Sequence, residues 1–171
     1  MKQILSTLVI VFACGLAKAQ TEKKEVNGGQ TAKGKWLIES STGFGTIHPS
    51  NTSFGLIFSP DLENVTWSIG SEAGYFIIDN LAIKGGLGYA DYFSYKIGAK
   101  YYISSKIPVQ LDYSGVFEQD YYGSVSYMGV QAGYAIFLGK NVSVEPGLRY
   151  NLDLDRQDNF FQLRVGFALH F

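Results

Sequence analysis

The last eleven residues of the chain, Phe161 to Phe171, alternate without interruption between two kinds of side chain. Every odd position is apolar, and every even position is polar or small. A period of two indicates a β-strand whose two faces meet different surroundings. Because a strand cannot satisfy its own backbone hydrogen bonds, this segment must pair with other strands.

The same strand character recurs through most of the chain, and no segment after residue 34 has a helical period. Turn-favouring residues separate the apolar runs. We therefore expect eight strands, at residues 36–46, 65–77, 81–91, 95–103, 107–116, 125–138, 142–151 and 160–171.

The connections between these strands alternate in length. Tight turns are expected at 78–80, 104–106 and 139–141, whereas longer links cover 47–64, 117–124 and 152–159. Short turns at one end and longer loops at the other are typical of single-chain outer-membrane barrels, in which the short turns face the periplasm. The predicted fold is therefore all-β: an eight-stranded antiparallel up-and-down transmembrane β-barrel, with both termini in the periplasm.

The alternation gives the predicted sheet one apolar face and one polar face. The apolar face is rich in Phe, Tyr, Trp, Leu and Ile and carries no charge. The polar face is filled mainly by glycine and by nine charged residues: Glu39, Glu72, Lys84, Lys96, Lys100, Asp112, Glu145, Arg149 and Arg164. The interior of an eight-stranded barrel is just wide enough to be filled by side chains, so the large apolar groups must point outward. Such an outer surface is stable in lipid.

The nine charges of the polar face are close to balanced, as buried charges require. Pairing adjacent strands predicts Glu72 near Lys84, Asp112 beside Lys96 and Lys100, and both Glu145 and Glu39 near Arg164. One interpretation is a polar plug that fills the lumen. The alternative is a narrow, porin-like channel in which these pairs open.

Aromatic residues on the apolar face cluster at two heights. Trp36, Tyr75, Tyr101 and Phe171 fall near the tight turns, and Trp67, Tyr89, Tyr113, Tyr127, Tyr150 and Phe161 fall nearer the longer loops. Two aromatic girdles around an aliphatic band are typical of membrane barrels.

The N-terminus resembles an export signal. Lys2 precedes a short apolar stretch, and Ala17-Lys18-Ala19 fits a small-x-small cleavage site, which predicts a signal peptide over residues 1–19. Cys14 leaves lipidation open as an alternative. Residues 20–34 are polar and aperiodic, and we expect a flexible N-terminal segment there, with the barrel over 35–171.

No pattern in the sequence predicts an enzyme, a cofactor site or a metal site. The two histidines, His48 and His170, belong to opposite ends of the expected barrel, about 30 Å apart for a strand of ten residues. No cysteine or histidine pair has metal-ligand spacing. The net charge of −1 offers no field for nucleic acid.

Residues 74–83 look like the second strand, tight turn and third strand of the small OmpA/OmpX-type eight-stranded outer-membrane barrels. Residues 99–103 and the strand ending in Phe171 are similar to that family too. The resemblance implies a monomer in outer-membrane lipid, with a role in envelope integrity, adhesion or surface interaction. It also implies recognition of Phe167, Leu169 and Phe171 by the barrel-assembly machinery. A soluble lipocalin-like carrier of a hydrophobic ligand is the remaining alternative.

Overall fold

The computed structural model describes residues 29–44, 54–59, 64–90, 92–117, 126–155 and 159–171. These residues form ten strand segments joined into one antiparallel sheet. The segments are β1 (Trp36–Phe44), β2 (Gly55–Ser59), β3 (Asn64–Ile78), β4 (Leu81–Tyr89), β5 (Phe93–Ile103), β6 (Ile107–Val116), β7 (Ser126–Gly133), β8 (Ile136–Phe137), β9 (Val142–Asp153) and β10 (Phe160–His170). In the described part of the chain, no helix is long and apolar enough to cross a membrane.

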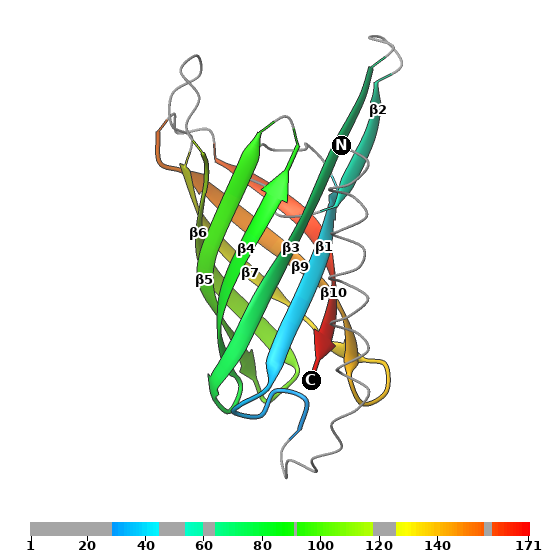
Figure 1. Ribbon diagram of the computed structural model, residues 1–171, viewed down its shortest axis with the longest axis vertical. Coiled ribbons are helices and arrows are strands. Elements are labelled where there is room, and N and C mark those ends of the chain that lie inside the picture. The colour runs from blue at the N-terminus through cyan, green and yellow to red at the C-terminus, as the bar shows by residue number, and fades with distance from the viewer. Residues whose placement is uncertain (1–28, 45–53, 60–63, 91, 118–125, 156–158) are drawn as a thin grey trace, which may run out of the picture.

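The sheet closes on itself through β1, which pairs with β10 on one side and with β3 on the other. The closed circuit runs β1, β3, β4, β5, β6, β7, β9, β10 and back to β1, so the protein is an eight-stranded antiparallel barrel (Figure 1). The backbone of Trp36 accepts from and donates to Phe171, at 3.0 and 2.6 Å, which places the two ends of the barrel side by side. The predicted eight-stranded antiparallel barrel is confirmed.

Two strand segments were not expected as separate elements. β2 lies in the predicted long link 47–64 and pairs only with the first residues of β3, forming an arm that extends past the rest of the barrel (Figure 1). Two of its five residues, Ile57 and Phe58, are of types that favour strands. The predicted strand 125–138 is interrupted between β7 and β8, where the Tyr134 amide donates to Pro146 and the Ala135 amide to Lys106.

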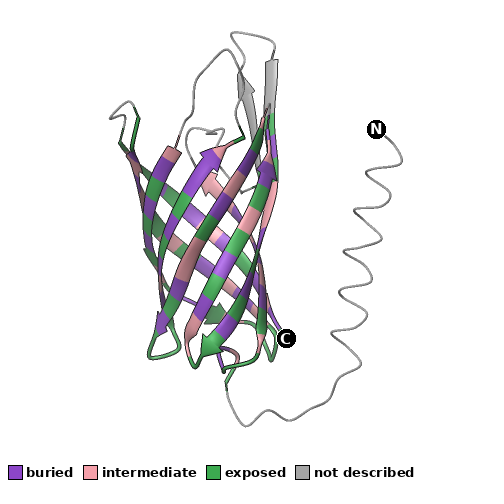
Figure 2. Cartoon of the chain, turned by 60° about the vertical axis from the view of Figure 1, so that its left-hand side comes forward, coloured by how far each residue is buried: buried purple, intermediate pink, exposed green. Residues whose placement is uncertain are grey.

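Burial alternates along the barrel strands, as Figure 2 shows by colour. The outward positions hold the large apolar side chains, and five of the described ones are at least 60% exposed: Leu87, Phe93, Ile97, Phe161 and Leu163. Polar side chains and glycines occupy most of the inward positions. The assignment of the two faces from the sequence period is therefore confirmed.

Candidate functional site: the barrel lumen

The structure places all nine predicted lumen charges in the interior of the barrel. Each of these residues is at most 4% exposed. They come from seven of the eight barrel strands and reach across the lumen as well as along its wall. Eight of them form one connected set of hydrogen bonds and ion pairs with Gln110, and the ninth, Arg164, bonds to Ser41. We call the nine charges and Gln110 the lumen network.

Lys100 lies at the centre of one half of the lumen network. Its Nζ contacts Glu39 Oε2 at 2.7 Å and Glu145 Oε2 at 2.5 Å. Lys84 Nζ contacts the same Glu39 oxygen at 2.6 Å and Glu72 Oε2 at 2.8 Å. Two ammonium groups therefore hold three carboxylates, and each carboxylate comes from a different strand.

The other half of the network centres on Asp112 and Arg149. Two parallel hydrogen bonds of 2.6 Å join the Arg149 guanidinium to the Asp112 carboxylate, the bidentate geometry in which this pair is strongest. Gln110 donates to the same carboxylate at 2.8 Å, and Lys96 contacts Glu72 at 2.8 Å. Gln110 also accepts from Lys84 at 2.9 Å, which connects the two halves.

Most ion pairs differ from those expected from strand adjacency. The Glu72–Lys84 pair forms as expected, whereas Asp112 pairs with Arg149 in place of Lys96 or Lys100. Glu39 and Glu145 pair with Lys100, and neither pairs with Arg164. The difference arises because the barrel is narrow and the charged side chains are long. Such a side chain can contact a residue on the opposite side of the lumen as easily as one on the adjacent strand.

Several glycines leave the space that the charged side chains occupy. A Cβ added at Gly129 would lie 2.3 Å from the Cζ atom of Arg149, and one at Gly86 would lie 2.7 Å from the Cγ atom of Glu72. Each glycine lies on the strand that pairs with the strand of the charged residue. The high glycine content of the polar face therefore accommodates the network.

An apolar cluster that was not predicted lies inside the barrel at its tight-turn end. The cluster packs around fully buried Phe76 and Tyr102 and consists of Leu37, Phe76, Ala82, Tyr102, Ala135 and Ala168, with Phe137 against it. The signal was present in the sequence, because Phe76 and Tyr102 have the same strand parity as the inward residues Glu72 and Lys100. Tyr102 also links the cluster to the network by donating to Glu145 Oε1 at 2.8 Å.

His170 lies within this apolar cluster, with its ring 5.5 Å from Phe137 and 6.2 Å from Tyr102 between centroids. The strand register, unlike the sequence, brings a serine to it: Ser143 Oγ lies 2.9 Å from His170 Nε2 and donates to Glu145. Because both side chains are fully buried, this pair has no surface that a substrate can reach. His48, the other histidine, lies outside the described residues.

Residues 29–35 cross the tight-turn end and bond to its turns. The Asn80 amide donates to the Thr31 carbonyl at 2.7 Å, and the Lys33 amide donates to Asp79 at 2.8 Å. Gly34 donates to Phe76 at 2.9 Å, and Thr31 is buried. Residues 29–34 of the predicted flexible segment are thus attached to the barrel, because they complete backbone hydrogen bonds at its end.

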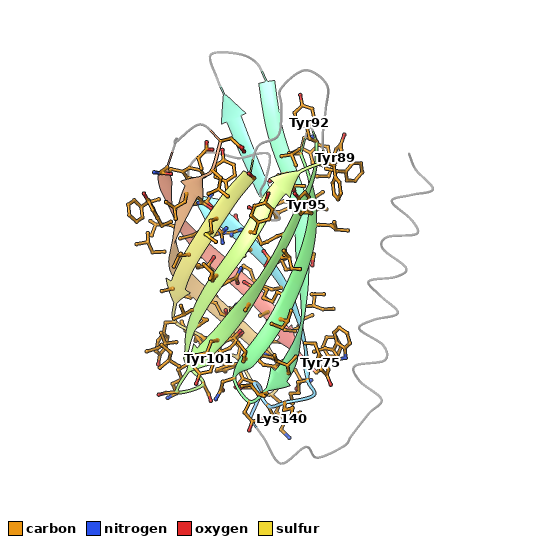
Figure 3. All side chains as sticks on the ribbon, turned by 90° about the vertical axis from the view of Figure 1, so that its left-hand side faces the viewer. Tyr75, Tyr89, Tyr92, Tyr95, Tyr101 and Lys140 are labelled. Atoms are coloured by element: carbon orange, nitrogen blue, oxygen red, sulfur yellow. The ribbon has the colours of Figure 1, made fainter. Side chains whose placement is uncertain are left out.

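Aromatic side chains occupy both rims of the outer surface. Tyr75 and Tyr101 lie at the tight-turn end, and Tyr89, Tyr92 and Tyr95 lie at the other (Figure 3). Neighbouring rings contact each other, as in the pair Trp36–Tyr75, with centroids 5.1 Å apart. Tyr127 differs from the expectation. It points inward and donates to Asp153 at 3.3 Å, because the residue parity of β7 places it with Gly129 and Gln131.

The other predicted residues fall into two groups. Phe167, Leu169 and Phe171 point outward from the last strand. Cys14 and residues 1–19 fall outside the described ranges. Among described residues, no group of three or more His, Cys, Asp or Glu side chains could hold a metal ion.

Comparison with known proteins finds similar structures. No protein-family model matches the sequence, and no curated protein matches it. The N-terminal β-barrel domain of OprF from Pseudomonas aeruginosa has a TM-score of 0.51 and 13% identity, covering 81% of this chain and 98% of that domain. The Yersinia pestis outer membrane protein Ail has a TM-score of 0.48 and 11% identity, covering 81% and 100%. Neisserial surface protein A has a TM-score of 0.41 and 17% identity, covering 80% and 96%. The chain therefore has the eight-stranded barrel fold of the small OmpA/OmpX-type outer-membrane proteins that its sequence resembles.

Proposed function

We propose that this protein is a monomeric, non-enzymatic outer-membrane barrel with a closed lumen, acting in envelope structure or in surface interaction through its longer loops. The observation that carries the proposal is the outward apolar belt. Its side chains are exposed all around the barrel, whereas the charges face inward. An outer surface of this size and apolarity is stable in contact with acyl chains and unstable in water.

The proposal includes a route to the membrane. Residues 1–19 act as a cleaved signal peptide, and the barrel-assembly machinery recognises the strand that carries Phe167, Leu169 and Phe171. Both termini face the periplasm, and the loops opposite the tight turns face the medium. The soluble-carrier alternative needs an apolar interior, which the burial pattern does not favour, because the large apolar groups face outward.

Cell fractionation of the full chain tests the location. We expect the protein in the outer-membrane fraction, with unboiled and boiled samples running at different apparent masses on a gel. Recovery of a folded monomer in buffer without detergent would contradict the proposal.

A charge on the apolar belt tests the contact with lipid. Ile97 is near the middle of β5, and Ile103 is at its tight-turn end; both are exposed. We expect Ile97→Arg to lower the free energy of unfolding in lipid vesicles by about 2–4 kcal/mol, and Ile103→Arg by about 0–1 kcal/mol. Equal effects at the two positions, measured by urea titration, would argue against a membrane belt.

The lumen network supports a plug, and conductance distinguishes this from a narrow channel. Ion pairs cross the lumen in two connected halves, and the apolar cluster lies inside the barrel at its tight-turn end. We expect no discrete single-channel steps from the wild-type protein in a planar bilayer. Regular steps at low voltage would favour the channel.

A further inference from the structure

One cation of the lumen network has no carboxylate partner. Lys84, Lys96, Lys100 and Arg149 each have a carboxylate oxygen within 4 Å. Arg164 has none among the described residues, and its Nη2 donates to the neutral hydroxyl of Ser41 at 2.6 Å. The four network carboxylates are already bound by the other four cations, so the positive charge left over in the network lies on Arg164.

Arg164 is also left with an unused donor. The residue is 2% exposed, and its Nε has no hydrogen-bond partner among the described residues. A buried guanidinium with an unsatisfied N–H is costly, because both its charge and its donor have left water. The cost falls if a small acceptor of negative charge occupies the space in front of Nε.

The strand positions opposite Arg164 carry no competing charge. The residues opposite it on the two neighbouring strands are Gly43 and Gly147, which supply no side chain. The neutral side-chain amide of Gln162 lies over Gly43, with its Nε2 atom 2.4 Å from where a Cβ would be. Ser41 accepts from Arg164 and keeps its own proton to donate.

Glu39, Glu72 and Asp112 attract Arg164 through space, but none forms an ion pair with it within 4 Å among the described residues, and each already holds another cation. Arg149 lies diagonal to it on β9, since Arg149 faces Gln162 in the register, and it adds positive charge. Asp153 is buried too, but it lies six positions beyond Gly147 along β9, about 20 Å away. This end of the network therefore combines excess positive charge with unused donors.

We propose that the lumen binds one small monovalent inorganic anion, such as chloride, at Nε of Arg164. The anion takes the place of a fifth carboxylate and brings the nine charges of the lumen network to neutrality. The site is inside the barrel and does not depend on the membrane location proposed above.

Bromide and chloride serve as probes. Crystals of the wild-type protein soaked in bromide should show an anomalous peak in hydrogen-bond range of Arg164 Nε. A water molecule at that position, with no anomalous signal, would overturn the proposal.

Stability gives a second measurement. When chloride replaces gluconate at constant ionic strength, the folding equilibrium constant should rise tenfold for each tenfold rise in chloride above the dissociation constant, about 1.4 kcal/mol. The dependence should be absent in Arg164→Met and unchanged in Lys140→Met, whose lysine is exposed in a tight turn. No chloride dependence in the wild type, or equal dependence in Arg164→Met, would contradict the site.

Discussion

Arg149→Met is expected to lower the free energy of unfolding by about 3–5 kcal/mol, the usual range when one partner of a buried ion pair is removed. The variant leaves Asp112 inside the barrel without the two 2.6 Å hydrogen bonds that now hold its charge. Gln110 remains as a donor, but a neutral amide cannot balance a buried carboxylate. Urea unfolding in lipid vesicles, followed by tryptophan fluorescence, measures the loss.

Two further variants separate the ion pair from the loss of side-chain volume. Asp112→Asn combined with Arg149→Met should recover much of the stability, because no unpaired carboxylate remains. Arg164→Met should have a smaller effect than Arg149→Met, since Arg164 has no carboxylate within 4 Å to leave behind. The assignment of partners is wrong if Arg164→Met is the more damaging of the two.

Gly98→Ala is expected to destabilise the barrel by about 1–3 kcal/mol or to prevent folding, as overpacking does. A Cβ at Gly98 would lie 2.4 Å from the Leu111 carbonyl oxygen and 2.7 Å from the Asp112 Cα. These are backbone atoms of the neighbouring strand β6, so no rotamer change can relieve the overlap. The variant must push β5 and β6 apart, at the strand that carries Asp112.

Gly85→Ala provides the matched control. Gly85 is in the adjacent strand β4 and is exposed, and the nearest atom to an added Cβ is 3.9 Å away. We expect it to fold in the same yield as the wild type, judged by the gel shift on heating. Equal loss of folding in both variants would mean that glycine is needed for chain flexibility and not for close approach.

The sequence predicts the barrel wall well because a wall is a local pattern. A period of two assigns Ile97 outward and Lys96 inward from neighbouring residues alone, and the structure agrees. The tight turns are local too: Asn80, Ser104 and Ser105 have positive φ, a conformation common in short hairpin loops. Both features follow from residues within a few positions of each other.

The contents of the lumen are harder to predict because they depend on distances between strands that are far apart in the sequence. Glu145 and Lys100 meet across the barrel, and neither strand's pattern indicates the other. The Ser143–His170 contact likewise depends on the register of β9 with β10. The crossing segment 29–35 was missed for a different reason, since short polar sequences carry no period.

The adjacency of Trp36 and Phe171 has a consequence for engineering. Backbone hydrogen bonds of 2.6 and 3.0 Å hold these two residues together at one rim. The first and last strands of the barrel therefore end side by side. A short linker from Phe171 to residues just before Trp36 would join the ends without crossing the barrel. New termini could then open between β6 and β7, giving a circular permutant whose β1 and β10 become a hairpin.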